Sequence, residues 1–302
     1  MYQIADAHSD FLSFNTLKLD DNRLFDHADA PRMLRGGIVL QVLAVWVPPE
    51  YPDTTEAGME QIRYLYSFIE NNPGFHLCTQ AEHLTLNQGV GVILAIESGE
   101  SIGCRASNIQ KVHSLGARML SLTWNDENGF ASGCMHEGGL KPEGLYAIDE
   151  LNRLHMALDV SHLNERGFWE AMERYTGTPC ASHSCVHDIC PVPRNLKRDQ
   201  ILHIISRGGY IGVNFYTEFL RGRHAVIHDV LDHIDYILGC GGENNVGFGS
   251  DFCGIQYTPE GLGSVADFQK LPEAMKRRGY PDGLIRKICY GNFDRYVLEF
   301  LH

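Results

Sequence analysis

The sequence predicts an α/β protein folded as a closed (β/α)₈ barrel, the TIM-barrel architecture. Short apolar runs rich in β-branched residues alternate with amphipathic helical patterns along the chain, and eight such runs can be counted. Continuous apolar strands separated by helices are typical of a parallel sheet that is covered on both faces. Eight strand–helix units favour a closed barrel over an open doubly wound sheet. Polar residues also recur where the runs end, as expected at the mouth of a barrel.

Each predicted strand is a short apolar run, and each predicted helix has apolar residues at three- and four-residue spacing. In chain order the strands span residues 2–7, 38–47, 90–96, 119–123, 156–161, 179–182, 210–215 and 245–250. The helices between them span residues 58–70, 107–115, 142–154, 165–174, 198–206 and 230–238. A last helix, residues 284–301, is expected to pack on the outside of the barrel.

An open doubly wound sheet is the competing arrangement, and it would carry a glycine-rich phosphate loop after an early strand. Here His8-Ser9-Asp10-Phe11 follows the first predicted strand instead. The sequence also shows no internal repeat and no Pro-, Gly- or Ser-rich linker that would divide it. We therefore expect a single barrel domain over residues 1–302.

The composition is that of a globular chain, with 44% hydrophobic and 21% charged residues among 302. Its 38 acidic and 25 basic residues give a net charge of −13, which makes nucleic acid an unfavourable partner. The start does not read as a signal peptide, and the longest apolar run is too short to span a bilayer. The sequence therefore predicts a cytoplasmic protein without a membrane partner. The nine cysteines are expected to be ordinary thiols rather than a disulfide framework.

Side chains that can bind metal follow five of the predicted strands. They are His8 and Asp10 after the first strand, Glu97 after the third, His162 after the fifth, His183 after the sixth and Asp251 after the eighth. In a barrel these strand ends converge on one mouth, where active sites lie. Alternate residues of an extended chain point to the same side, so His8 and Asp10 can share one ion.

Glu97 follows the apolar run of residues 92–96, where an unpaired carboxylate would be costly to bury. It could pair with a nearby Arg or Lys, but beside three histidines we favour a bridge between two cations. A lone histidine at a strand-to-loop junction, such as His162 or His183, is more often a satisfied loop residue. The set as a whole suits zinc or a similar divalent ion, with water completing the coordination shells; its five members are His8, Asp10, Glu97, His162 and His183.

Two further residues are candidates for substrate chemistry. Asp251 would face the metal pair and could act as base for the attacking water and then as acid for the leaving amine. A sixth metal ligand or a loop cap is the alternative for Asp251. Arg194, in Pro-Val-Pro-Arg-Asn, carries a planar fork that matches a carboxylate bidentately. Both a substrate carboxylate and an acidic loop residue remain open as its partner.

With these residues in view, the chain resembles the membrane (renal-type) dipeptidase family, the M19 metallopeptidases, nearly from end to end. The resemblance rests on an ordered set of segments, residues 8–10, 95–99, 158–162, 182–184, 193–195, 213–216, 247–252 and 291–293. It implies a barrel that holds two zinc ions. By likeness the ligands are His8 and Asp10 on one ion, His162 and His183 on the other, and Glu97 between them.

The same likeness assigns Arg194 to the C-terminal carboxylate of a dipeptide substrate and Asp251 to proton transfer. It implies a zinc-dependent dipeptidase, whose substrates can include dipeptides with a C-terminal D-residue. It also implies a homodimer. These roles for the ligand residues agree with those that strand-end spacing suggests independently.

One departure from the family pattern affects the substrate side of the site. In the family Leu-Thr-His follows the fourth strand, and the histidine helps to polarise the scissile carbonyl; here the sequence is Leu122-Thr123-Trp124-Asn125. We expect Trp124 and Asn125 to contact substrate, although an indole N–H donates one hydrogen bond and cannot titrate. The departure keeps open an amidohydrolase that acts on a lactam or an N-acyl amino acid. A catalytically silent binding barrel is the last alternative, but every candidate ligand is intact.

Overall fold

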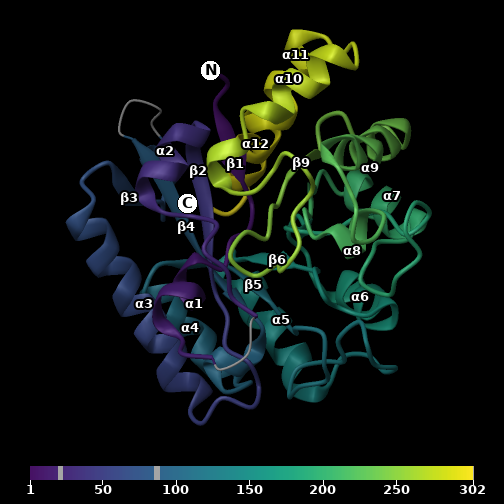
Figure 1. Cartoon of the computed structure of the whole chain (residues 1–302). Helices are drawn as coiled ribbons and strands as arrows, with labels where there is room; N and C mark the ends of the chain where they lie inside the picture. Colours follow the sequence, from purple (N-terminus) through teal and green to yellow (C-terminus); the bar gives the residue numbers. More distant parts are fainter. Residues whose placement is uncertain (20–22, 85–88, 302) are drawn as a thin grey trace.

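The computed structural model describes residues 1–19, 23–84 and 89–301. Eight parallel strands follow one another around a barrel (Figure 1): β1 (Ile4–Asp6), β2 (Ile38–Val45), β4 (Val90–Glu97), β5 (Ala117–Ser121), β6 (Ala157–Asp159), β7 (Cys180–Ala181), β8 (Tyr210–Val213) and β9 (Val246–Phe248). β9 pairs with β1, and β2 pairs with β4, so the eight strands form a closed ring. The predicted TIM barrel is confirmed, and each strand lies close to its predicted bounds.

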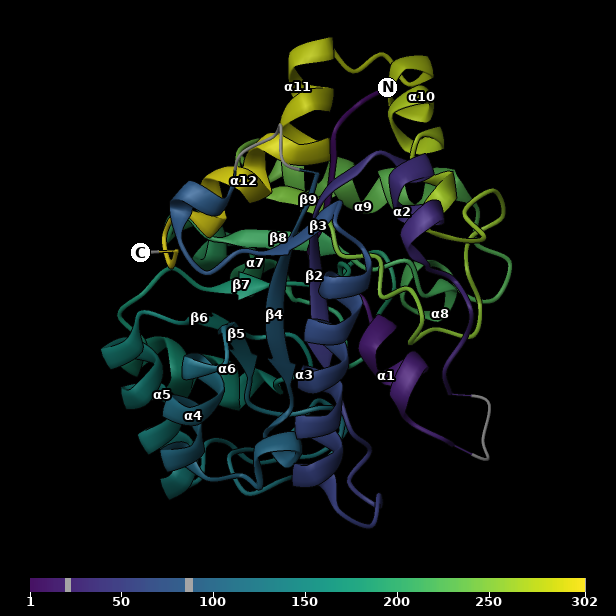
Figure 2. The same ribbon diagram turned by 90° about the vertical axis from the view of Figure 1, so that its left-hand side faces the viewer.

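A ninth strand, β3 (Phe75–Leu77), lies beside this ring and was not predicted. It pairs in parallel with the first part of β4, beginning with Phe75 opposite Val90, whereas β5 pairs with the last part of β4. Figure 2 shows β3 next to the amino-terminal part of β4. Its three residues include a histidine and are too few to produce a periodic signal.

Helices cover the outside of the barrel. They are α1 (Phe11–Thr16), α2 (Ala30–Gly36), α3 (Thr54–Asn71), α4 (Ile109–Ser114), α5 (Pro142–Leu154), α6 (Glu165–Arg174), α7 (Arg198–Ser206), α8 (Thr217–Leu220), α9 (Ile227–Gly239) and α10 (Lys270–Arg277). α5, α6 and α7 begin and end as predicted, whereas α3 begins earlier because Asp53 caps it by accepting the N–H of Glu56. Among the described helices, none combines the length and apolarity needed to cross a membrane.

Successive side chains along the strands point alternately into two hydrophobic cores. Residues on one side of seven of the eight strands fill the barrel interior: Ala5, Leu40, Val42, Ile93, Ala95, Met119, Ala157, Cys180 and Tyr210. The other side packs against the helical layer, as Ile4, Leu94 and Ile211 do. This alternation follows from the two-residue period of a strand and explains why the strands read as continuous apolar runs.

The predicted C-terminal helix is present as a continuous helical segment over residues 282–297, but its expected place on the outside of the barrel is wrong. The segment consists of α11 (Asp282–Arg286), a π-helical stretch (Lys287–Gly291) and α12 (Asn292–Val297). Phe293, Tyr296 and Phe300 pack with the side chains of the barrel interior, so α12 closes the amino-terminal end of the barrel (Figure 2). The interior there is lined by small residues such as Ala5 and Ala157, which leaves room for these rings. Periodicity reveals an apolar helix face but cannot say which surface it covers.

Candidate metal centre

Six side chains that can bind metal meet at the carboxyl-terminal mouth of the barrel. His8 and Asp10 follow β1, Glu97 ends β4, His162 follows β6, His183 follows β7 and Asp251 follows β9. All six are buried, with at most 9% of each residue's surface exposed. The structure thus brings together the residues that the sequence suggested as ligands and as proton carrier.

Glu97 lies at the centre of the group. Its Oε2 is 3.2 Å from Nε2 of His8, and its Oε1 is 3.0 Å from Nε2 of His162 and 3.6 Å from Nε2 of His183. The rings of His8 and His183 stack with their centroids 3.6 Å apart. The two oxygens of one carboxylate therefore face two separate sets of histidine nitrogens, which is the arrangement that a bridging ligand needs.

Two further carboxylates that could bind a metal ion lie close to His8. Its Nε2 lies 3.6 Å from Oδ2 of Asp10 and 4.0 Å from Oδ1 of Asp251. Nε2 of His8 and Oδ1 of Asp10 are buried, and neither makes a well-directed hydrogen bond within the described part of the chain. An unsatisfied buried polar atom costs about 1–3 kcal/mol, so native proteins normally supply a partner. A divalent cation would satisfy both atoms, and the residues therefore fit such an ion.

The other two histidines are held so that their Nε2 atoms face each other. His162 donates its Nδ1–H to Oδ1 of Asn125 at 2.8 Å, and His183 donates its Nδ1–H to Oγ of Ser182 at 2.7 Å. Ser182 can accept this bond because its own hydroxyl proton is donated to Asp159. Each neutral ring then presents an Nε2 lone pair, and the two Nε2 atoms are 2.9 Å apart. Two lone pairs at this distance repel each other unless they share a cation, which again fits a metal site.

Burial and neighbouring charges set the protonation states of the three histidines. Burial and the nearby Arg194 lower the pKa of His162 to about 4, and burial together with His8 lowers the pKa of His183 well below its usual value. For His8, burial is outweighed by Glu97 and the other carboxylates, which raise its pKa well above its usual value. The carboxylates therefore favour positive charge at this point of the site.

Asp251 is held in an unusual backbone conformation. Its φ is +63°, in the left-handed region, and its N–H donates to the carbonyl of His8 at 3.2 Å. Its Oδ2 accepts a hydrogen bond from Nδ2 of Asn214 at 2.8 Å. Burial and the nearby Asp10 raise its pKa well above the usual range. A non-glycine residue in this region costs about 1–3 kcal/mol, and such residues cluster at functional sites.

Two buried carboxylates behind the site were missed at the sequence level. Asp6 ends β1 and accepts hydrogen bonds from the N–H and the hydroxyl of Ser250, both at 2.7 Å. Asp159 ends β6 and accepts the N–H groups of Ser161 at 3.0 Å and Ser182 at 2.9 Å. These bonds tie β1 to the loop after β9, and β6 to the loop after β7, so they fix the strand ends that carry ligands. The available signal was an acidic residue at the end of an apolar run with a histidine shortly after it.

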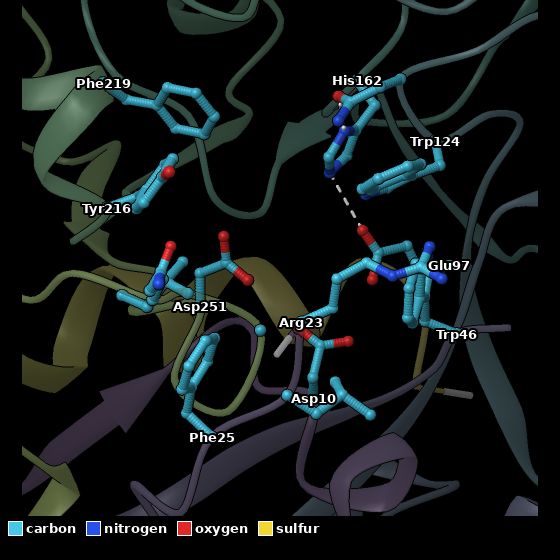
Figure 3. A pocket seen from close by; sticks show the side chains of 15 residues that line it. Asp10, Arg23, Phe25, Trp46, Glu97, Trp124, His162, Tyr216, Phe219 and Asp251 are labelled. Atoms are coloured by element: carbon cyan, nitrogen blue, oxygen red, sulfur yellow. Dashed lines mark hydrogen bonds and ion pairs between the residues drawn. The ribbon is translucent and has the colours of Figure 1, made fainter. Parts of the chain in front are cut away.

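A cavity of about 270 Å³ opens over the candidate metal centre (Figure 3). Asp10, Glu97, His162 and Asp251 line it on the metal side. Aromatic residues form much of the remaining wall: Phe25, Trp46, Trp124, Tyr216 and Phe219. The Trp124 ring lies 5.3 Å from that of Trp46 and 6.1 Å from that of His162, centroid to centroid. Trp124 therefore occupies the cavity wall directly beside a candidate ligand.

Arg194 and Asn125 differ in their access to this cavity. Asn125 lines it, but its Oδ1 is engaged with His162. Arg194 lines a neighbouring cavity of about 320 Å³ that also reaches His162. Its guanidinium donates to Oγ of Ser184 and to the carbonyl of His183, both at 2.8 Å. Arg194 is 6% exposed, and its Nε makes no hydrogen bond with any described residue.

Comparisons with known proteins identify the family and the fold. The family model of the membrane dipeptidases, peptidase family M19, matches residues 2–299. A metallo peptidase from Rhodobacter sphaeroides, solved with a phosphinate mimic of the dipeptide L-Ala-D-Ala, is 28% identical, with a TM-score of 0.90 and 99% of each chain covered. The solved dipeptidase AC, a metallo peptidase of family M19, is 30% identical, with a TM-score of 0.89 and 99% of each chain covered. An uncharacterised protein in the pqqA 5′ region of Klebsiella pneumoniae is 32% identical over 262 residues, which cover 81% of this chain and 96% of that protein.

Proposed function

Since the chain belongs to peptidase family M19, the membrane dipeptidases, and is a metal-dependent dipeptidase, we propose that it hydrolyses dipeptides with two zinc ions bound at the barrel mouth. One observation supports two ions rather than one. The carboxylate of Glu97 directs one oxygen to His8 and the other to His162 and His183. We assign His8 and Asp10 to one ion, His162 and His183 to the other, and Glu97 to both.

When bound, such a pair of ions supplies a nucleophilic water at neutral pH and polarises the scissile carbonyl. The chain itself has to place the substrate and move one proton. We assign the proton to Asp251, which takes it from the attacking water and passes it to the nitrogen of the leaving amine. Asp251 lines the cavity, and the bond from Asn214 fixes one of its oxygens, so the other is left to face His8.

Arg194 is the proposed partner of the dipeptide's C-terminal carboxylate. Its donors come from a rigid, buried guanidinium that is held against the carbonyl of His183, next to the metal ligands. A fixed distance between this cation and the metal pair would restrict substrates to two residues. The relative solved with a mimic of L-Ala-D-Ala supports extending the substrate class to dipeptides with a C-terminal D-residue.

Metal analysis together with a substrate panel tests this proposal. The purified protein should contain about two zinc ions per chain and should cleave dipeptides, including some with a D-residue at the C-terminus. Trp124 in the cavity wall favours one alternative, an amidohydrolase that acts on a lactam or an N-acyl amino acid. Full metal occupancy with turnover of those compounds and of no dipeptide would select that alternative. The homodimer and the cytoplasmic location stay predictions.

A further inference from the structure

We propose that Asn125 is a positioning residue that fixes the orientation and the tautomer of His162, so that one of the two metal ions depends on it. The inference rests on the proposed function, because it takes His162 as a metal ligand. It changes the expected role of Asn125, because the side chain would orient the metal-binding His162 rather than contact the substrate. The direct observation is the 2.8 Å hydrogen bond between Nδ1 of His162 and Oδ1 of Asn125.

The loop between β5 and α5 holds His162 at two points. Besides the bond that His162 donates to Asn125, the N–H of Cys134 donates to the main-chain carbonyl of His162 at 2.7 Å. His162 has a φ of +68°, a left-handed conformation that a histidine rarely adopts without support. The same loop therefore restrains both the backbone and the ring of this residue.

Asn125 is itself held in place by close packing. The N–H of Met135 donates to the carbonyl of Asn125 at 3.1 Å, and the thiol of Cys134 donates to its Oδ1 at 3.3 Å. A Cβ added to Gly133 would lie 2.4 Å from the carbonyl oxygen of Asn125 and 2.3 Å from that of Trp124. The chain turns back on itself at Gly133 with no space for a side chain, so the main chain of Asn125 is held in place, and the Cys134 thiol helps to hold its side chain.

The amide oxygen determines which nitrogen of His162 carries the proton. A neutral imidazole has one N–H, and an acceptor at Nδ1 puts it there, which leaves the Nε2 lone pair for a cation. Nε2 of His162 lies 3.0 Å from Oε1 of Glu97, the oxygen assigned to the same ion. Without the acceptor, the ring could place its proton on Nε2 and donate it to Glu97, which would compete with metal binding.

The groups that hydrogen-bond to Nδ1 of His183 and of His162 differ in charge. Its Nδ1 is bonded to Ser182, which passes the interaction to the carboxylate of Asp159. His162 has only a neutral amide in the corresponding position. A carboxylate at position 125 should therefore orient His162 at least as well, because a charged acceptor forms the stronger hydrogen bond.

Equilibrium zinc titration against a chromogenic chelator tests the inference on four variants. We expect Asn125→Leu and Asn125→Ala, which both remove the acceptor, to weaken the binding of one of the two zinc ions by roughly 10–100-fold, the usual effect of losing an outer partner of a metal-bound histidine. Asn125→Asp should bind both ions at least as tightly as the unchanged protein. Asp126→Asn is the matched control in the same loop. The Asp126 carboxylate is exposed, and the side chain that it contacts in the described part of the chain is His136, so this variant should bind both ions normally. The alanine variant keeps the test valid if the larger leucine disturbs folding.

Unchanged affinity for both ions in Asn125→Leu and Asn125→Ala would overturn the inference. Equal weakening in Asn125→Asp would also overturn it, because a merely structural role would not be rescued by a charged acceptor. His162→Ala separates this failure from failure of the proposed function. If that variant retains both ions with unchanged affinity, His162 is no ligand, and the metal assignment falls together with the role of Asn125. If it loses one ion while the Asn125 variants do not, only the role of Asn125 is wrong.

Discussion

At the scale of single residues, the site is defined by buried carboxylates that face one another. Asp10, Glu97 and Asp251 are each at most 9% exposed, although a buried charge without compensation is costly. Their common neighbour is Nε2 of His8, at 3.6, 3.2 and 4.0 Å. Three carboxylates this close can all be ionised only when cations balance their charge, and the bridging position of Glu97 offers an oxygen to each of two cations.

Asp251→Asn tests the proton-transfer role. The amide keeps the size and the bond geometry of the carboxylate but cannot accept the proton of the attacking water. We expect kcat for a good dipeptide to fall by roughly 10²–10⁴-fold, the usual contribution of general acid–base catalysis, with both ions retained. Steady-state kinetics beside metal analysis checks this. Loss of an ion together with the activity would make Asp251 a ligand instead.

Arg194→Ala tests substrate recognition. A hydrogen bond to a charged group contributes about 1.5–3 kcal/mol, so kcat/KM for dipeptides should fall roughly 10–150-fold. Metal content should not change. Arg194→Lys should recover only part of the loss, because an ammonium cannot form the bidentate pair. Kinetics on one dipeptide and on its C-terminal amide decides: if both substrates respond equally to Arg194→Ala, the guanidinium does not bind the carboxylate.

At the scale of elements, the positions of the ligands depend on close approach between strand ends. A Cβ on Gly212 of β8 would lie 2.0 Å from the carbonyl oxygen of Ser182, and a Cβ on Gly249 just after β9 would lie 1.8 Å from the same oxygen. The absence of a side chain at both glycines therefore lets Ser182, which precedes His183, pack closely against β8 and against the end of β9. The left-handed residues His162 and Asp251 serve the same end, because they turn the chain inward where a strand ends.

Gly249→Ala tests this packing. The added methyl meets a main-chain oxygen that cannot move away freely, so we expect about 1–3 kcal/mol of destabilisation. We also expect weaker metal binding, because His183 follows the displaced carbonyl. Gly239→Ala at the end of α9 is the control, since a Cβ there meets no described atom within 4 Å. Denaturant unfolding and zinc titration should separate the two variants, and equal behaviour would contradict the packing argument.

The sequence reveals long amphipathic elements better than short or interior ones. α5, α6 and α7 carry clear helical periodicity and coincide with their predicted bounds. β3 is too short to produce a pattern, and no local signal shows that the apolar face of α12 packs against the interior side chains at the amino-terminal end of the barrel. The six candidate site residues could be found because each stands at a strand end, where barrel geometry forces convergence. The hydrogen bond of Asn125 and the cavity of Arg194 could not, since both depend on how individual loops turn.

At the scale of the whole molecule, folding brings five strand ends together and so assembles the candidate site. The ligands are spread from His8 to Asp251, and the unfolded chain holds them far apart. A ligand that binds only the folded state stabilises it by mass action, so metal binding and folding are coupled. Removing the ions would leave the carboxylates and the Nε2 lone pairs to repel one another.

Chelation should therefore lower the melting temperature. Ions present at 1,000 times their dissociation constant stabilise the fold by about 4 kcal/mol each. Two ions together then contribute about 8 kcal/mol, so at roughly 2–4 °C per kcal/mol for a large domain we expect the melting temperature to fall by roughly 16–32 °C after complete removal of zinc. Differential scanning calorimetry with and without a chelator, followed by zinc re-addition, measures it. An unchanged melting temperature after verified metal loss would contradict the coupling.

Anomalous diffraction at the zinc absorption edge, from crystals of the zinc-loaded protein, tests the central claim most directly. Two peaks should appear in each chain, one beside His8 and Asp10 and the other beside His162 and His183, with Glu97 reaching both. A single peak, or strong peaks away from these side chains, would contradict the account.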